Sequence, residues 1–278
     1  MSEHKERISD EQLKQQLIAG SIQSEQYKFP TETVDLPSKG WFYPEDNPLS
    51  SGTIELKYPT AKEEDILTSA NLIKNGTVID KFLKSIIVSP VKYNDLLIGD
   101  KNAIMVAARI LAYGADYPFE LTCPACGAKQ TDLSINLSEL ENKNTPTDAP
   151  RGSRAFEMKL PASERTIGFN LMTHGDERKV EHIIEGQKKL TRKTGVDPEL
   201  TSRFKVVLNS IDGNTEQSEI DKFVDNEFLS RDAQAFRKHI KDLTPDISMT
   251  FDFVCDECGH EERVMDFPIT SNFFWPKS

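Results

Sequence analysis

The strongest structural signals in this sequence are two short stretches, Cys123-Pro-Ala-Cys126-Gly127 and Cys255-Asp-Glu-Cys258-Gly259. They contain all four cysteines of the 278-residue chain, and each lies between two segments with the alternating pattern of β-strands. A gap of two residues lets both thiolates of a turn face one ion, and the glycine permits the positive φ that turns backbone N–H groups toward sulfur. The stretches therefore predict the two halves of a zinc ribbon.

The two cysteine pairs are 128 residues apart, far more than the about 15 to 20 residues usual in such sites. An internal duplication explains this distance, because each copy then supplies half of the site. A shift of 132 residues aligns both cysteine turns and pairs seven further positions: Leu97 with Leu229, Asp100 with Asp232, Ala103 with Ala235, Ile104 with Phe236, Leu111 with Leu243, Phe119 with Phe251 and Leu137 with Ile269.

A shorter shift relates the earlier parts of the two halves. It pairs residues 78–86 with 203–211, and Ile54 with Ile167. We therefore expect two diverged copies of a unit made of a strand, helices, a strand, the cysteine turn and a strand. The alternative is that both halves only share a helix-then-hairpin plan.

The expected fold class is α+β, with the two copies joined by one four-cysteine zinc ribbon and preceded by an extended N-terminal arm. Periodicity and capping residues predict helices from Ala61, over 78–86, 101–113, 175–190, 198–211 and 218–243, and a hairpin near 156–171. The expected segments are a flexible or docking segment 1–28, a Pro-rich aromatic arm 29–53, a first repeat 54–137, a linker 138–154, a second repeat 155–269 and an aromatic tail 270–278.

The predicted metal ligands are Cys123, Cys126, Cys255 and Cys258, holding one structural zinc ion per chain. Four sulfur ligands close the shell and leave no position for catalysis. A redox pair is disfavoured because neither motif joins a strand to a helix, and disulfides are disfavoured by the expected cytosolic setting. His260, next to Cys258, is either an exposed loop residue or a support to the ligands.

Charge and hydropathy exclude several classes of protein. The 34 Lys and Arg against 45 Asp and Glu give a net charge of −11, which disfavours binding to a phosphate backbone. The most apolar stretch, 82–91, is shorter than the about 18 residues of a membrane span and contains Lys84, Ser85 and Pro90. The polar N-terminus resembles no secretion signal, so we expect a cytosolic protein without a membrane span.

No sequence motif indicates an enzyme. The chain has no P-loop, dinucleotide-binding, metalloprotease or serine-hydrolase motif. His174 and His182 lie among charged residues that are typical of a solvated helix face, and residues 63–65 are typical of an acidic helix start. We therefore expect neither catalysis nor a small-molecule substrate.

Two aromatic clusters are candidates for contact with a partner protein, because aromatic side chains are enriched at the centres of interfaces. The first is Trp41, Phe42 and Tyr43 in the arm, and the second is Phe273, Phe274 and Trp275 at the C-terminus. The alternative for the C-terminal cluster is that it packs back on the cysteine turns.

The opening of the chain resembles the baseplate hub family of T-even-type contractile-tailed bacteriophages. The resemblance covers roughly residues 30–130 and is carried by Leu36-Pro-Ser-Lys-Gly-Trp-Phe-Tyr-Pro44, Gly52-Thr-Ile-Glu-Leu56, Thr60-Ala-Lys-Glu-Glu-Asp-Ile-Leu67 and Asn75-Gly76. It implies a late viral protein without enzymatic activity. The family includes hub subunits of the virion and assembly factors that act in the host cytoplasm, with other hub or tail proteins as partners.

The alternative function is a zinc-ribbon adaptor that works with nucleic acid. The net charge of −11 disfavours it, and only Lys129 and Arg263 are basic residues close to the cysteine turns. A metal-dependent hydrolase ranks third, because it needs an open coordination position that four cysteines do not leave.

Overall fold

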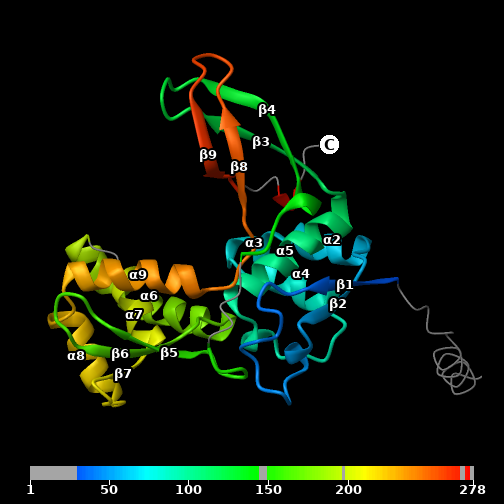
Figure 1. Ribbon diagram of the computed structural model, residues 1–278. Helices are drawn as coiled ribbons and strands as arrows, with labels where there is room; N and C mark the ends of the chain where they lie inside the picture. The colour runs from blue at the N-terminus through cyan, green and yellow to red at the C-terminus, as the bar shows by residue number, and fades with distance from the viewer. Residues whose placement is uncertain (1–29, 144–148, 196–197, 270–272, 276–278) are drawn as a thin grey trace, which may run out of the picture.

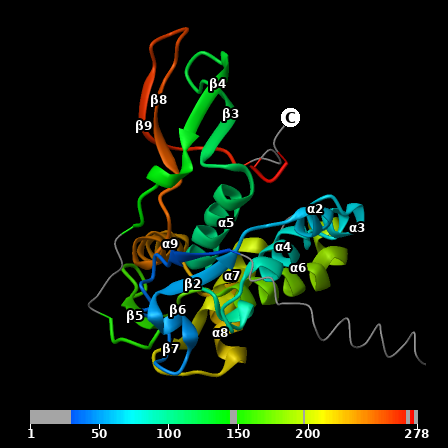
Figure 2. The same cartoon turned by 90° about the vertical axis from the view of Figure 1, so that its right-hand side faces the viewer.

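The computed structural model describes residues 30–143, 149–195, 198–269 and 273–275, with backbone alone for 188–194. The chain forms three lobes (Figures 1 and 2): a first lobe from 30–113, a second lobe from 149–243, and a knuckle lobe from 116–136 and 250–266 that projects from the other two. Helices combined with small antiparallel sheets confirm the α+β class. The predicted segment 1–28 lies outside the described residues.

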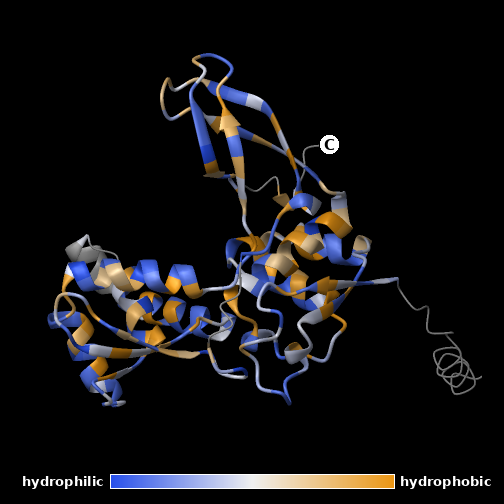
Figure 3. Cartoon of the chain, viewed as in Figure 1, coloured by the Kyte–Doolittle hydropathy of each residue, from blue (hydrophilic) through white to orange (hydrophobic). Residues whose placement is uncertain are grey.

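The first lobe is a hairpin packed against helices. Its elements are β1 (Thr31–Asp35), β2 (Thr53–Lys57), α2 (Ala61–Leu67), α3 (Ala70–Lys74), α4 (Val78–Ile86) and α5 (Ile98–Tyr113), with 3-10 helices η1 (Pro48–Ser51) and η2 (Tyr93–Asp95). Helix α2 begins where predicted, because the Thr60 N–H donates to Glu63 at 3.0 Å. Figure 3 shows hydrophobic residues concentrated around α5, where Ile54, Leu56, Phe82, Leu83 and Ile104 are fully buried.

The second lobe is a three-stranded antiparallel sheet covered by helices. Its elements are β5 (Ala155–Lys159), β6 (Thr166–Asn170), α6 (His174–Thr194), α7 (Glu199–Val207), β7 (Leu208–Ile211), α8 (Gln217–Asn226) and α9 (Ser230–Leu243), with strand order β5-β6-β7. The helix predicted over 198–211 ends at Val207, because the following residues pair with β6. The helix predicted over 218–243 is interrupted between α8 and α9.

The knuckle lobe consists of two separate hairpins. They are β3 (Asp116–Thr122) with β4 (Lys129–Asn136), and β8 (Thr250–Val254) with β9 (Glu261–Asp266). In the first, the register shifts between Phe119 and Leu121; in the second, it shifts between Phe251 and Phe253. The two irregularities are 132 residues apart, which is the separation that the sequence shift predicts. η3 (Leu137–Glu139) follows β4.

Helices α5 and α9 also begin 132 residues apart, at Ile98 and Ser230. The third residue of each helix is an aspartate without solvent exposure, Asp100 and Asp232. Each aspartate accepts hydrogen bonds from the turn of the preceding hairpin. Both turns start with Leu-Pro, and each contains a non-glycine residue with positive φ, Lys39 at 50° and Glu164 at 58°.

The two stretches that the shorter shift pairs, 78–86 and 203–211, differ in secondary structure. Residues 78–86 are entirely helical, as α4, whereas 203–211 contain the second half of α7 and all of β7. The nine residues of α4 correspond better to the nine of α7. Each of these helices is followed directly by a residue that pairs with a hairpin strand, Ile87 with Leu56 and Leu208 with Phe169.

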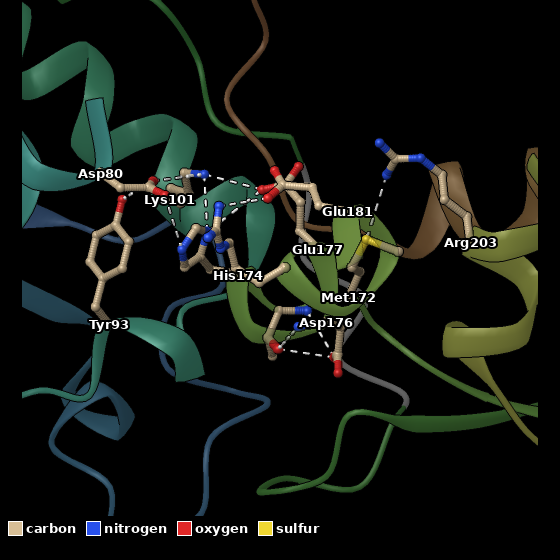
Figure 4. A network of polar contacts seen from close by, with 11 residues as sticks. Asp80, Tyr93, Lys101, Met172, His174, Asp176, Glu177, Glu181 and Arg203 are labelled. Atoms are coloured by element: carbon tan, nitrogen blue, oxygen red, sulfur yellow. Dashed lines mark hydrogen bonds and ion pairs between the residues drawn. The ribbon is translucent and has the colours of Figure 1, made fainter. Parts of the chain in front are cut away.

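A buried polar network joins the first and second lobes (Figure 4). His174 begins α6, and its side chain is 2% exposed; its Nε2 lies 3.3 Å from Asp80, and its Nδ1 lies 3.1 Å from Lys101 Nζ. Lys101 also pairs with Glu177 at 3.1 Å. The prediction of a solvated face is therefore wrong for His174, because docking of α6 on the first lobe encloses this side chain. Among the described residues, no helix is long and apolar enough to cross a membrane.

Candidate metal centre

The four predicted ligands converge at the end of the knuckle lobe. Their sulfur atoms all lie within 4.8 Å of one another. The Sγ atoms of Cys123 and Cys258 are 3.8 Å apart, as are those of Cys126 and Cys255. Zn–S bonds of about 2.3 Å place the sulfurs of a tetrahedral site about 3.8 Å apart, whereas a disulfide requires about 2.05 Å. The cluster therefore fits a metal ion such as zinc and contains no disulfide.

Both cysteine turns have the same backbone geometry. The Cys123 N–H donates to the Ala128 carbonyl at 2.8 Å, and the Cys255 N–H donates to the His260 carbonyl at 2.9 Å. Gly127 and Gly259 have φ of 75° and 67°, and the N–H of each donates at 2.9 Å to the carbonyl of the first cysteine in its turn. This left-handed conformation is the reason that glycine follows the second cysteine.

Local hydrogen bonds shift the thiol pKa values in opposite directions. Burial opposes ionisation of Cys123, but the N–H groups of Cys126 and Ala125 lower its pKa to about 6. The N–H of His260 favours the Cys258 thiolate, but the adjacent Cys126 thiol and burial raise the pKa of Cys258 to about 12. Four thiolates can share this space only when a cation balances their charge.

An apolar cluster supports the sulfur atoms. Cys123 and Cys255 are each 1% exposed and pack with Phe253, which is also 1% exposed. The equivalent residues Phe119 and Phe251 meet edge to face across the two hairpins, with ring centroids 5.1 Å apart. Cys126 and Cys258 lie at the surface, so each turn contributes one buried and one exposed cysteine.

Sequence reasoning missed one residue beside the sulfurs. The side chain of Gln130 is buried, and its Nε2 donates to Cys255 Sγ at 3.7 Å. The equivalent position in the second turn is Glu262, whose carboxylate lies 3.7 Å from His260 Nε2. The described contact of the His260 side chain is with the Glu262 carboxylate and not with sulfur. This contact agrees with the prediction that His260 is a loop residue. The 132-residue shift gives no signal for Gln130, because it pairs this residue with Glu262, whose described contact is with His260.

The arm places two of its three aromatic candidates in the core. Phe42 and Tyr43 are 2% and 4% exposed. The Tyr43 hydroxyl donates to Asp100 at 2.6 Å, while Trp41 is half-buried, and its Nε1–H donates to the Ala149 carbonyl at 2.9 Å. The aromatic residues therefore fasten the arm to the chain itself, which leaves only part of Trp41 accessible to a partner.

The C-terminal aromatics also pack on the chain. Phe273 is 1% and Phe274 3% exposed, and their rings lie edge to face with Tyr117 and Phe82 at 5.1 and 5.3 Å. The half-buried Trp275 donates from Nε1 to the Leu67 carbonyl at 2.9 Å. The cluster therefore packs back on the first lobe and the base of β3, below the cysteine turns.

Comparison with known proteins places this zinc-ribbon-like arrangement in a family. Residues 31–275 match the T4 bacteriophage base plate protein family. The chain belongs to this family. No curated protein and no solved structure matches this chain.

The family match is not confined to the cysteine turns. The matched region extends from β1 to Trp275 and includes all three lobes. A baseplate protein functions as a structural component of a phage tail, in contact with other tail proteins. The phage expectation from residues 30–130 is thus confirmed at the level of the baseplate.

Proposed function

We propose that this baseplate protein is a subunit or an assembly factor of the central hub, and that one structural zinc ion per chain joins its two halves. The observation that carries the proposal is the set of 3.8 Å sulfur separations between turns that lie 128 residues apart in a baseplate-family chain. The hub assignment is further supported by the resemblance of the Leu36–Pro44 segment to hub proteins.

The zinc ion in this proposal has a structural role and no catalytic one. All four positions of a tetrahedral shell are taken by cysteine, so no ligand position is open to water or substrate. We accordingly propose a protein without enzymatic activity or a small-molecule substrate. It would act in the host cytoplasm during assembly and, as a hub subunit, remain in the virion. The net charge of −11 disfavours the nucleic-acid adaptor.

We further propose that the two halves are diverged copies related by an approximate two-fold axis through the metal. A two-fold rotation that exchanges the copies places Cys123 on Cys255 and Cys258 on Cys126. The Cys123–Cys258 contact then becomes the Cys255–Cys126 contact, and the Sγ–Sγ distance is 3.8 Å in both. The equal offsets of α5 and α9, and of the two register shifts, support this relationship. The site then resembles the self-complementary interface of a two-fold dimer within one chain.

Elemental analysis tests the metal. Purified protein should contain one zinc per chain, and Cys123→Ser should lose it. Glu257→Ala, which changes an exposed non-ligand position inside the second turn, is the matched control and should retain zinc. A folded protein purified without metal would refute the zinc assignment.

Quantitative mass spectrometry of purified phage particles and of the infected-cell lysate tests the hub role. A few copies per particle would identify a hub subunit, and presence in the lysate alone would identify an assembly factor. Many copies distributed along the tail tube, or tight and salt-sensitive binding to DNA or RNA, would contradict the proposal.

A further inference from the structure

A second candidate site lies away from the cysteines, where the second lobe meets Ile98 at the start of α5. A groove of about 350 Å³ runs between α7 and α9 and is called here the α7–α9 groove. Leu200, Phe204 and Val207 line it from α7, and Phe236 and Ile240 line it from α9. The spacing of the α7 residues gives a continuous apolar stripe. Leu200 is 42% exposed, so part of this stripe faces solvent.

The border of the groove is basic, although the chain as a whole is acidic. Arg203 on α7, Arg237 and Lys241 on α9, and Lys143 line it. Its one acidic lining residue, Asp246, already lies 3.6 Å from Lys143. Arg203 pairs with a glutamate one turn earlier on α7 and donates to the Met172 sulfur (Figure 4). Within the described residues, Arg237 and Lys241 have no ion-pair partner.

We infer that the α7–α9 groove binds an acidic, amphipathic α-helix of another tail protein. An apolar floor between two helices accepts the hydrophobic face of a third helix, and Arg237 and Lys241 on the α9 wall pair with Asp or Glu beside that face. The nine residues of α7 span about 14 Å, which corresponds to two to three turns of a bound helix. The net charge of −11 opposes such a partner only at long range, because physiological salt screens charges beyond about 8 Å.

The shape of the site distinguishes this partner from the other classes that basic residues attract. A nucleic acid requires an extended row of cations along its backbone, and the cations here surround an apolar floor. A membrane-binding helix presents a protruding apolar face to lipid, whereas this floor lies in a groove. The inference takes the partner from the tail and therefore rests on the proposed function, but the surface differs from the metal centre.

A defined peptide serves as the probe. A fluorescein-labelled 14-residue helix with leucine at positions i, i+3, i+4 and i+7 and glutamate at its flanks is titrated with the full-length, metal-loaded protein. Fluorescence anisotropy should show saturable binding that weakens as salt increases. The same peptide with a scrambled sequence, or with lysine for glutamate, should bind at least about tenfold more weakly, because it loses the apolar stripe or the charge complementarity.

Two variants with equal charge change locate the binding. Arg237→Glu with Lys241→Glu should weaken peptide binding by about tenfold or more. The control, Lys222→Glu with Lys238→Glu, changes exposed lysines outside the groove lining and should bind like the unmodified protein. Leu200→Gln should weaken binding several-fold. Thermal melting of each variant verifies that it remains folded.

Several outcomes would overturn the inference. These are equal binding by the Arg237/Lys241 variant, equal binding of the scrambled peptide, and tighter binding of a short DNA duplex than of the acidic peptide. Self-association that the same variant abolishes would assign the groove to a second copy and also overturn it. None of these outcomes alters zinc content or the presence of the chain in phage particles, so a failure here is distinguishable from a failure of the proposed function.

Discussion

Helices α5 and α9 both have a buried aspartate as their third residue, but different groups donate hydrogen bonds to the two aspartates. Asp100 accepts hydrogen bonds from the Ser38 N–H and hydroxyl at 2.9 and 2.7 Å and from the Tyr43 hydroxyl at 2.6 Å. Asp232, at the equivalent position, accepts from two successive backbone N–H groups of the turn at 162–163, at 2.7 and 3.0 Å. The first half therefore combines one backbone N–H with two side-chain hydroxyls, whereas the second half makes the contact with two backbone N–H groups.

This difference appears in the electrostatics of the two carboxylates. Burial raises the pKa of Asp100 even though Tyr43 and Ser38 donate to it. Burial also opposes ionisation of Asp232, but hydrogen bonds from the turn lower its pKa below the usual value. Two helix starts with similar backbone geometry thus satisfy a buried aspartate with different donors. Because Asp100 is enclosed with more buried donors, its loss should cost more.

We expect the largest loss of stability when metal is removed from the two cysteine hairpins, β3–β4 and β8–β9, which are the most similar parts of the two halves. Chelation of the metal should remove stabilisation on the order of 10 kcal/mol, the scale of structural zinc sites. Amide hydrogen exchange should then increase throughout residues 116–136 and 250–266, while α5 and α9 stay protected. Unchanged exchange in the hairpins would show that the two halves hold together without metal.

Asp100→Ala should have the next largest effect. It leaves the Ser38 N–H, the Ser38 hydroxyl and the Tyr43 hydroxyl without their acceptor in a buried site, so we expect a loss of about 4 kcal/mol. Urea unfolding measures this loss. Tyr43→Phe keeps the ring but removes the donor to Asp100 and the acceptor of the buried Leu97 N–H, so it should cost about 2 kcal/mol. If both variants are equally stable, Asp100 does not hold the arm in place.

Asp232→Ala should be less costly, because it leaves only two backbone N–H groups unpaired at the turn. We expect about 2 kcal/mol in the same urea measurement. Asp225→Ala, on the outer face of neighbouring α8, is an exposed control and should cost about 0.5 kcal/mol or less, since surface ion pairs contribute little. A cost for Asp232→Ala equal to that of Asp100→Ala would contradict the difference between the two helix starts.

The junction between the halves should contribute the smallest, pH-dependent effect. The His174 imidazole, whose Nδ1 lies 3.6 Å from the Glu177 carboxylate, lowers the pKa of Glu177 to about 2; burial opposes this shift and the charge of Lys101 adds to it. The stabilisation of the folded state by ionised Glu177 is therefore complete above the unfolded-state pKa of about 4.3 and is lost as the pH falls toward 2.

Glu177→Gln should cost about 1 kcal/mol at pH 7, after allowance for solvent screening, and should flatten the stability profile between pH 5 and pH 2. Urea midpoints measured at several pH values test this effect. Glu181→Gln, on the same helix and exposed, is the control and should retain the profile of the unmodified protein. A Glu177→Gln profile as steep as that of the unmodified chain would exclude Glu177 as its source.

Local pattern was enough to predict much of the fold. The alternation of Ile54 and Leu56 and the Thr60-x-x-Glu63 pair located β2 and the start of α2, because strand pairing and helix capping depend on neighbouring residues. Residues 208–211 were mispredicted as helix because only the available edge of β6 makes them a strand. Tertiary context overrides local propensity in such short segments.

Sequence patterns alone were sufficient to predict the cluster of four cysteines, the two hairpins, the α+β class and a phage baseplate protein. Cysteine spacing, periodicity and motifs encode these features within a few residues of one another. Three features became visible only in the folded chain: the Leu-Pro turns contact Asp100 and Asp232, Phe273 and Phe274 belong to the core, and a groove with basic residues forms between α7 and α9. These features join residues far apart in the chain, and packing of whole elements determines which of those residues meet.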